Sequence, residues 1–436
     1  MAEAVTVLRG RLLWFAREPE GADDAAAYRY VEDGGLVFAD GLIAWAGDWS
    51  DLPLAWRGTD HADHRPHLIM PGFIDPHIHF PQGQVVASYA GSLLEWLNGY
   101  TFVEEQKYAD PAHAAAMATA FCDMLLAHGT TSAVAFGSVH RAAAEALFAE
   151  AERRSMRIVA GKVMMDRNAP EALTDTAQSG YDDTNALIAR WHGRGRLGVA
   201  ITPRFALTST EAQLEAAGAL LAAHPDCLMQ THLSENTAEI ETVAGLFPWA
   251  RDYTDVYDRF GLLSPRSLLG HCIHLGGRER ARLAETRSVA VFCPTSNLFL
   301  GSGHFDLAAA KAAGMRHAVA TDIGGGTSWS MLRTLDEGYK VLNMQHQRYH
   351  PLRSFHQATL GNAQAIGMAG RIGTLAAGSE ADVIVLDAAA TPAMALRMQT
   401  VETLAEELFV LQTLGDDRAV AACYVSGSPA RGGTIR

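Results

Sequence analysis

The sequence predicts an α/β fold, a closed (β/α)8 TIM-type barrel with a small β-sandwich domain formed by both chain termini. Eight short apolar runs alternate with longer helical segments, mostly at roughly 30–45 residues per unit, as in βα units with a parallel sheet. Eight such units favour a closed barrel over an open sheet. No GxGxxG or Walker motif follows a strand, so a nucleotide-binding sheet has little support.

The predicted barrel strands are apolar or β-branched runs that end in a polar residue. They cover residues 67–79, 131–137, 157–165, 197–204, 227–233, 267–273, 288–294 and 316–322. Helical composition predicts helices over 111–129, 140–154 and 209–224. These elements place the barrel in residues 67–371. The segment 391–415 is helix-like, and the sequence does not say where it packs.

The two flanks of the chain, residues 1–66 and 372–436, have a different pattern. VTVLRGRLLWFA and GGLVFADGLIAWAGDW near the start combine alternating apolar residues with glycine-containing turns, which is typical of small antiparallel strands. GTLAAGSEADVIVLDA and AVAACYVSGSPA near the end are similar. Because chain termini often lie close together, both flanks are expected to form one smaller domain.

Composition excludes several classes of protein. The 436 residues include 35 basic and 49 acidic side chains, a net charge of −14. That balance argues against a nucleic-acid surface, which needs clustered Lys and Arg. No run approaches the roughly 18 apolar residues of a membrane span, and the N-terminal segment lacks a signal-peptide pattern. Five scattered Cys without CxxC spacing predict neither disulfides nor a Cys-ligated zinc. A cytoplasmic protein that binds no membrane is expected.

His77 and His79 form the sharpest candidate motif. Functional side chains of a (β/α)8 barrel come from the carboxyl ends of its strands, and the first predicted strand ends in His77-Ile78-His79. Residues i and i+2 of a strand face the same way, so both imidazoles point into the barrel mouth. Neutral imidazole nitrogen is a good ligand for Zn²⁺.

Three more residues add to this pair. His232 ends the fifth predicted strand, Glu235 follows it in THLSEN, and Asp322 ends the eighth. Three imidazoles and one carboxylate form a metal site that leaves a position for water, whose pKa the metal would lower to about 7. Glu235 is then within reach to move protons. For Asp322, which precedes three glycines, the alternative is a turn or helix cap.

Two further strand ends carry His271 and Arg204. Arg204 is either a surface charge or a group that grips a polar substrate. The HxE…PCxxC pattern of cytidine deaminases and the HExxH of zincin proteases are both absent. No lysine on the fourth strand is obvious as a bridge between two metals, so one metal is expected. Three His and one Asp suit zinc and also iron.

These residues, in this order, resemble the amidohydrolase superfamily: HxH on strand one, His on strands five and six, Asp on strand eight. Longer segments narrow the resemblance to the guanine deaminase family. They are PGFIDPHIHFPQ (71–82), SLLEWLNGYTFVEEQKYAD (92–110), GTTSAVAFGSVH (129–140), MQTHLSEN (229–236), RDYTDVYD (251–258), CPTSNLFLGSG (293–303) and TDIGGGTSWSML (321–332).

The resemblance implies hydrolytic deamination of guanine to xanthine and ammonia by a metal-activated hydroxide, in purine catabolism or salvage. It also implies one zinc per subunit, with iron as the alternative, and a homodimer. The implied metal ligands are His77, His79, His232 and Asp322. The implied catalytic residues are Glu235, His271 and Asp322, and the implied substrate-binding residues are Gln82, Arg204 and Phe205.

The resemblance also implies individual roles. Glu235 shuttles protons to the ring nitrogen and the departing amine, while Asp322 accepts a proton from the attacking water. His271 hydrogen-bonds the hydroxide or the developing oxyanion. Gln82 and Arg204 bind the polar edge of the purine, and the ring of Phe205 stacks on the base.

Two alternatives remain. The first is another aminohydrolase of this fold, acting on a different purine, a pyrimidine or a triazine base. The second is a catalytically inactive barrel that serves as a scaffold. Such a protein would have lost some of the metal-ligand residues, whereas this sequence keeps all of them. The sequence departs from the family at Val103, often Pro, and at Phe292, where His is expected before Cys293.

Overall fold

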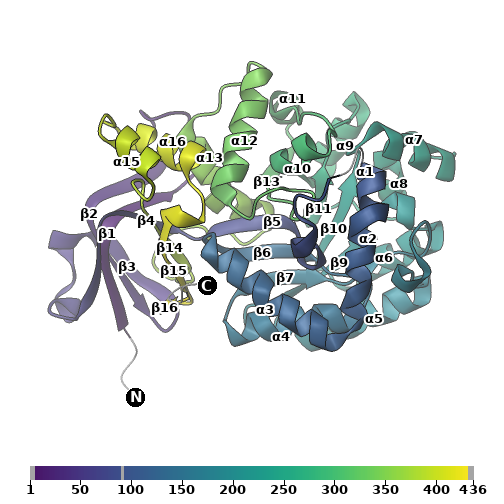
Figure 1. Cartoon of the computed structure of the whole chain (residues 1–436), viewed down its shortest axis with the longest axis horizontal. Helices are drawn as coiled ribbons and strands as arrows, with labels where there is room; N and C mark the ends of the chain where they lie inside the picture. Colours follow the sequence, from purple (N-terminus) through teal and green to yellow (C-terminus); the bar gives the residue numbers. More distant parts are fainter. Residues whose placement is uncertain (1–4, 90–92, 431–436) are drawn as a thin grey trace.

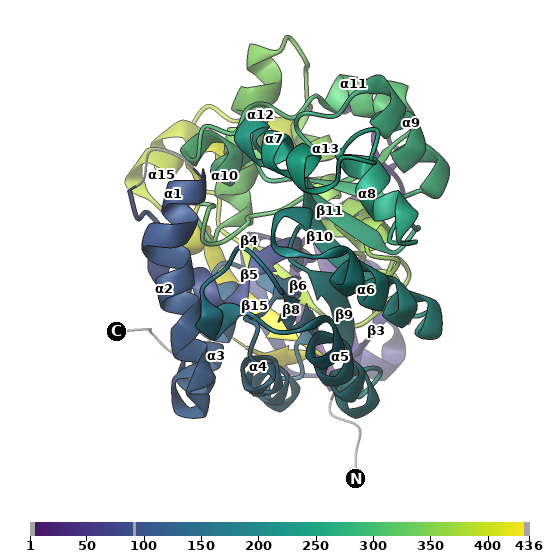
Figure 2. The ribbon, with the colours of Figure 1, turned by 90° about the vertical axis from the view of Figure 1, so that its right-hand side faces the viewer.

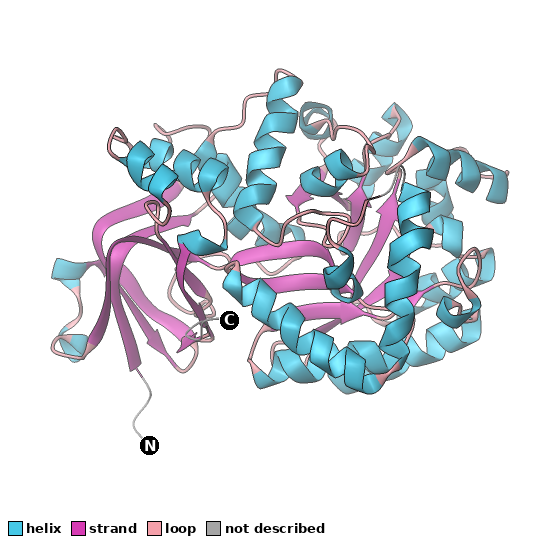
Figure 3. Cartoon of the chain, viewed as in Figure 1, coloured by secondary structure: helices cyan, strands magenta, loops and turns pink. Residues whose placement is uncertain are grey.

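Strands gather in two separate groups, a barrel surrounded by helices and a curved sheet beside it (Figure 1, Figure 3). The computed structural model describes residues 5–89 and 93–430. Among these residues, no helix combines the length and the apolar character needed to cross a bilayer.

The barrel is built from eight parallel strands that neighbour one another in chain order, and it confirms the predicted fold class. Its strands are β5 (Phe73–His79), β6 (Thr130–Phe136), β7 (Arg157–Gly161), β9 (Gly198–Pro203), β10 (Leu228–Leu233), β11 (Ser267–His271), β12 (Val289–Phe292) and β13 (Arg316–Val319). All eight lie within or at the edge of the predicted runs. Two runs are interrupted.

The first interruption is at Gly72, which ends one strand of the run 67–79 and precedes β5. A Cβ at this glycine would lie 2.2 Å from the Thr131 hydroxyl oxygen, so only glycine allows β5 to turn into the barrel here. The run 157–165 divides into β7 and the two-residue β8 (Val163–Met164), which pairs with β9.

The barrel closes where β5 meets the segment after β13. The amide of His79 donates to the carbonyl of Ile323 at 2.7 Å, and the amide of Asp322 donates to the carbonyl of His77 at 3.0 Å. Deeper in the barrel, the fully buried carboxylate of Asp75 on β5 accepts a hydrogen bond from the Thr321 hydroxyl. These bonds join the first and last strands at the carboxyl end of the barrel.

Helices surround the barrel (Figure 2), and two of the three predicted ones begin at side-chain caps. Asp110 caps α3 (Pro111–Ala127) and Thr210 caps α6 (Glu211–Ala223). The third predicted helix is α4 (Arg141–Arg153). Helix α5 (Ala177–Trp191) was not predicted, because its amino-terminal part contains Gly, Asp, Thr and Asn, which are weak helix formers; a capping box at Thr176 starts it.

The second group of strands is one seven-stranded sheet made from both ends of the chain, in the order β16-β15-β14-β4-β1-β2-β3. Its strands are β1 (Val5–Phe15), β2 (Tyr28–Ala39), β3 (Leu42–Asp48), β4 (His61–Pro71), β14 (Val383–Leu386), β15 (Val420–Val425) and β16 (Ser428–Pro429). Strand β4 pairs with β1 on one side and with β14 on the other, which confirms a β domain built from both flanks. The domain boundaries at 66/67 and 371/372 stay a prediction.

Ionic groups join the sheet domain to the amino-terminal ends of barrel strands. Arg157 opens β7, and its Nε donates to Glu380 at 2.7 Å. Arg196, just before β9, donates to Glu380 at 2.9 Å and to Asp382 at 2.9 Å. Both acidic residues lie within three residues of the start of β14.

The segment 391–415 is helical, as its composition suggests, and forms α15 (Pro392–Met398) and α16 (Leu404–Leu414). The Gln412 amide donates to the carbonyl of Leu335 on α12 (Met331–Met344), and the Arg11 guanidinium on β1 donates to Glu407 at 2.7 Å. Helix α16 therefore connects the barrel helices with the terminal sheet.

Candidate active site

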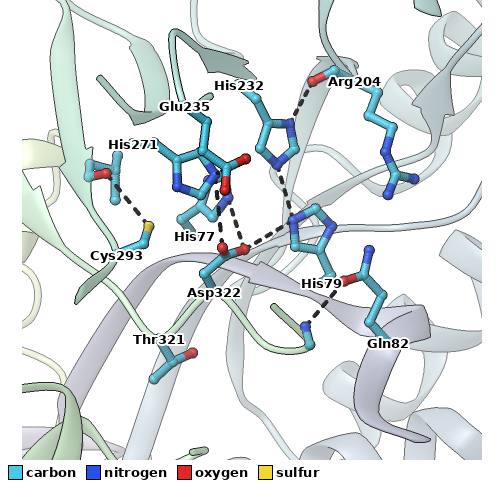
Figure 4. Close-up of polar contacts among 12 residues, drawn as sticks. His77, His79, Gln82, Arg204, His232, Glu235, His271, Cys293, Thr321 and Asp322 are labelled. Atoms are coloured by element: carbon cyan, nitrogen blue, oxygen red, sulfur yellow. Dashed lines mark hydrogen bonds and ion pairs between the residues drawn. The ribbon is translucent and has the colours of Figure 1, made fainter. Parts of the chain in front are cut away.

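Four predicted metal ligands meet at the carboxyl end of the barrel. His77 and His79 end β5, His232 lies on β10, and Asp322 follows β13. One ligand atom from each lies within 4.8 Å of all the others, and all four residues are buried. Figure 4 shows the imidazoles converging on the Asp322 carboxylate.

The spacing of these atoms fits a metal ion. Oδ1 of Asp322 lies 3.3 Å from Nε2 of His77 and 3.2 Å from Nε2 of His79. Nε2 of His79 lies 3.2 Å from Nε2 of His232. Atoms that each lie about 2.0–2.1 Å from one zinc ion are at most about 4 Å apart, and these three separations satisfy that limit.

Hydrogen bonding supports the same conclusion. The backbone carbonyl of Arg204 accepts a 2.7 Å hydrogen bond from Nδ1 of His232, so the lone pair of this imidazole lies on Nε2, which faces the cluster. Both ring nitrogens of His77 and Nδ1 of His79 are buried without a hydrogen-bond partner among the described residues. Buried polar atoms are normally paired, and a cation satisfies lone pairs that converge. The chain thus carries a site for a divalent metal ion.

Local backbone geometry holds these side chains close together. A Cβ at Gly270, the residue before His271, would lie 2.6 Å from Cε1 of His77, so the bare glycine makes room for that imidazole. Ser234, His271 and Asp322 have positive φ angles of 52°, 71° and 53°. Non-glycine residues rarely adopt this conformation, and such strain concentrates at functional sites.

Glu235 faces the metal cluster from the loop after β10. It is buried, and Oε1 accepts a 2.9 Å hydrogen bond from the Ser302 hydroxyl. Burial, with the neighbouring charge of Asp322, raises the pKa of Glu235 well above its ordinary value. Burial therefore favours the protonated form of this carboxyl, which suits a proton donor.

His271 lies beside Glu235, with its Nε2 atom 3.4 Å from Oε2 of that residue. Burial lowers the pKa of His271 to about 3, so the ring is neutral. The Asn297 amide nitrogen donates to Nδ1 at 2.9 Å, which leaves the ring proton on Nε2. That N–H faces the cavity as a donor.

The pKa of Asp322 is shifted in the opposite direction from that of Glu235. Burial alone would raise the pKa of this carboxyl, but the adjacent imidazoles of His77 and His79 lower it well below its usual range. Asp322 is therefore ionised, as a metal ligand must be.

The cluster opens into a cavity at the carboxyl end of the barrel, which is where small-molecule sites of this fold lie. The predicted substrate-binding residues Gln82, Arg204 and Phe205 all line this cavity together with Glu235 and His271. Its apolar wall is formed by Leu93, Trp96, Leu97 and Leu300.

Glu105 is the site residue that sequence reasoning missed. It is fully buried at the end of α2 (Phe102–Glu105) and hydrogen-bonds both Gln82 and Arg204. A weak signal was present: Glu105 follows the apolar Phe102 by three residues, so both lie on one helical face. A lone acidic residue on an apolar face indicates a buried partner.

The two departures from the family pattern lie outside the cavity wall. Val103 is exposed on α2. Phe292 stacks on Phe305 with ring centroids 5.1 Å apart and lines a separate apolar cavity beneath α12.

Known proteins resemble this chain over nearly all of its length. The model of the amidohydrolase family matches residues 68–429. The guanine deaminase of Escherichia coli K12 is 44% identical over 422 residues, 96% of either chain. The solved structure of E. coli guanine deaminase superimposes with a TM-score of 0.94 at 43% identity, covering 98% of this chain and 99% of that one. A guanine deaminase from C. acetobutylicum with guanine in its active site has a TM-score of 0.88 at 27% identity, covering 98% and 100%.

Proposed function

The chain belongs to the amidohydrolase family, and from this premise we propose that it hydrolyses guanine to xanthine and ammonia. One observation carries the proposal: the His/Asp cluster, the Glu235 carboxyl group and the Arg204 guanidinium border the same cavity. That arrangement supports hydrolysis at a carbon–nitrogen bond, and the full-length similarity to guanine deaminases selects guanine among the bases.

We assign the metal site to His77, His79, His232 and Asp322, with zinc as the ion and iron as the alternative. A divalent ion bound there supplies the Lewis acidity that activates water for attack.

Glu235 and Asp322 move the protons in this proposal. Glu235 gives its proton to the ring nitrogen beside the carbon that bears the amino group, and Asp322 accepts a proton from the attacking water. Glu235, now a carboxylate, takes the proton of the added hydroxyl and transfers it to the amine, which leaves as ammonia while the ring carbonyl forms. The proton held by Asp322 then returns to Glu235. The Nε2–H group of His271 donates to the oxygen that has been added to the ring. One guanine and one water are consumed, and one xanthine and one ammonia are released.

Gln82, Arg204 and Phe205 bind the base. The Arg204 guanidinium donates to the ring carbonyl, the Gln82 amide binds the adjacent polar edge, and the Phe205 ring packs against the purine. Such a buried polar set discriminates strongly, because a base without the matching groups leaves the protein donors unpaired.

The experiment that tests the proposal measures ammonia release from guanine, adenine, cytosine and a melamine-like triazine, with metal analysis of the same sample. Release from guanine at the highest kcat/KM is expected. Preference for another base would favour the alternative aminohydrolase. A metal-loaded protein that releases no ammonia from any of them would favour the scaffold.

Two further expectations stay predictions: that the protein is a homodimer and that it is located in the cytoplasm. Sedimentation of the metal-loaded protein tests the first of these.

A further inference from the structure

Glu105 makes three hydrogen bonds to the two polar residues that bind guanine in the proposed function. Its Oε1 accepts from Nε2 of Gln82 at 2.9 Å and from Nη1 of Arg204 at 2.9 Å. Its Oε2 accepts from the same Nη1 at 2.7 Å. All three side chains are at least 97% buried. One carboxylate therefore connects the segment that follows β5, which carries Gln82, to Arg204 at the end of β9.

These contacts fix the direction of the Arg204 guanidinium. The planar group has five N–H donors in a rigid fork, so holding one nitrogen fixes where the other two point. The Phe102 ring packs over it, 5.4 Å from Cζ to the ring centroid. Within residues 5–89 and 93–430, the Arg204 guanidinium donates hydrogen bonds to Glu105 alone, and it does so from Nη1 alone. Nε and Nη2 keep their N–H groups for a ligand.

The same carboxylate fixes the Gln82 amide. Nε2 donates to Glu105, while Oε1 accepts from the amide of Gly324 at 3.1 Å. A free amide presents either its oxygen or its nitrogen after a half-turn. An ionised carboxylate only accepts, so it selects the orientation in which the nitrogen faces Glu105.

Charge gives Glu105 a second effect. A buried guanidinium without a counter-charge is strongly unfavourable and would attract an anion into the cavity. Paired with Glu105, Arg204 presents hydrogen-bond donors at an edge with no net charge. Guanine is neutral at neutral pH, whereas xanthine has a second carbonyl in place of the amino group and loses a ring proton more readily.

We propose that Glu105 is a positioning residue that sets specificity: it aims the Arg204 and Gln82 donors and makes the cavity prefer a neutral base over an anionic one. This inference rests on the proposed deamination of guanine. It predicts that Glu105 acts on substrate binding and on the release of anionic product rather than on the metal.

The test compares Glu105→Gln with the matched variant Glu104→Gln. Glu104 is the adjacent residue on α2, but its carboxylate pairs with Lys107 at 2.5 Å and lies 3.8 Å from His113. Steady-state kinetics with guanine, xanthine inhibition above neutral pH, and metal content are measured for both.

Glu105→Gln should raise KM for guanine about 10- to 100-fold, the effect of one lost hydrogen bond to a charged group, with a smaller change in kcat. Xanthine inhibition should become stronger relative to guanine binding, and metal content should match that of the unmodified protein. Glu104→Gln should change none of these.

Glu105→Asp serves as the conservative variant and covers the case in which Glu105→Gln does not fold. It keeps the charge but withdraws the carboxylate by one methylene, so KM should rise while the sensitivity to xanthine stays normal. If Glu105→Asp leaves KM unchanged, or if Glu105→Gln behaves like Glu104→Gln or loses its metal, the inference is overturned. If the unmodified protein releases no ammonia from guanine, the proposed function fails instead.

Discussion

Gly270 shows at the scale of one residue how a missing side chain makes room for a proposed metal ligand, His77. The His77 imidazole occupies the space where a Cβ of residue 270 would stand, 2.6 Å from Cε1. Gly270 has no side chain and could not itself bind a metal. Its importance comes only from the His77 imidazole on β5 that it faces.

Gly270→Ala should therefore displace His77 and reduce the bound metal, measured by elemental analysis of purified protein. Gly277→Ala, at the start of α9 (Gly277–Thr286), is the control, because a Cβ there meets no atom within 4 Å. Equal metal content in the two variants would contradict the steric argument.

Glu235→Gln should retain the metal and lose turnover by about 10²- to 10⁴-fold, the usual contribution of a positioned acid or base. Glutamine has the same shape as glutamic acid but transfers no proton. Glu241→Gln, on the exposed face of α7 (Thr237–Leu246), is the matched control. Near-normal ammonia release by Glu235→Gln would show that the proton shuttle is another group.

Much of the site could be predicted residue by residue, because its histidines and its aspartate stand directly at the ends of apolar strands. Two histidines separated by one residue, or an aspartate at the end of a strand, stand out in a sequence. Glu105 does not stand out, because its partner Arg204 lies 99 residues away along the chain. Asp75 likewise binds Thr321, 246 residues away. Such pairs depend on how the barrel closes, which no local pattern specifies.

At the scale of elements, the charged contacts between barrel strands and β14 hold the two domains together. Arg157 and Arg196 converge on Glu380 from the starts of two neighbouring strands. Burial would raise the pKa of Glu380, but the hydrogen bond from Arg157 and the charges of both arginines lower it below its usual value.

Because the pKa of Glu380 is lower in the folded protein, its contribution to stability is complete above the unfolded value of about 4.5 and is lost as pH falls through the folded value. The free energy of unfolding in urea should fall below about pH 4.5, and Glu380→Gln should reduce that dependence.

At neutral pH, Glu380→Gln should cost about 3–5 kcal/mol, since it leaves two largely buried guanidinium groups without this partner. Glu285→Gln removes an exposed partner of Arg282 and should cost less than about 1 kcal/mol. Equal costs would mean that the domain contact contributes no more than a surface ion pair.

Element boundaries were less predictable than element types. The run 67–79 is continuous in its apolar character, yet its first five residues belong to the terminal sheet and the rest to the barrel. The change occurs at Gly72, and its cause is the Thr131 side chain of the neighbouring strand. Helix α5 was missed for another reason: weak helix formers occupy its amino-terminal part, and its start is marked by the capping box at Thr176.

At the scale of the whole molecule, the proposed metal site links metal binding to folding, because its four residues lie on or just after three strands distributed through the barrel. Removal of the metal by a chelator should lower the midpoint of thermal unfolding. An ion present at 100 times its Kd adds about 2.7 kcal/mol to the stability of the folded state.

His79→Ala provides the control for this measurement. Without one ligand the variant should bind metal weakly, so the chelator should hardly change its unfolding temperature. A chelator effect of the same size in both proteins would show that the stabilising ion binds elsewhere.

The position of β4 in the terminal sheet has a consequence for protein synthesis. Strand β4 leaves the ribosome early, and β5 with its two histidines follows after a single glycine, but β14, the partner on one side of β4, is made only near the end of translation. Until then β4 presents an unpaired edge, which is prone to pair with other chains. A premature stop codon before β14 would spare every proposed metal ligand and still leave β5, with its two histidines, attached to an open, aggregation-prone edge.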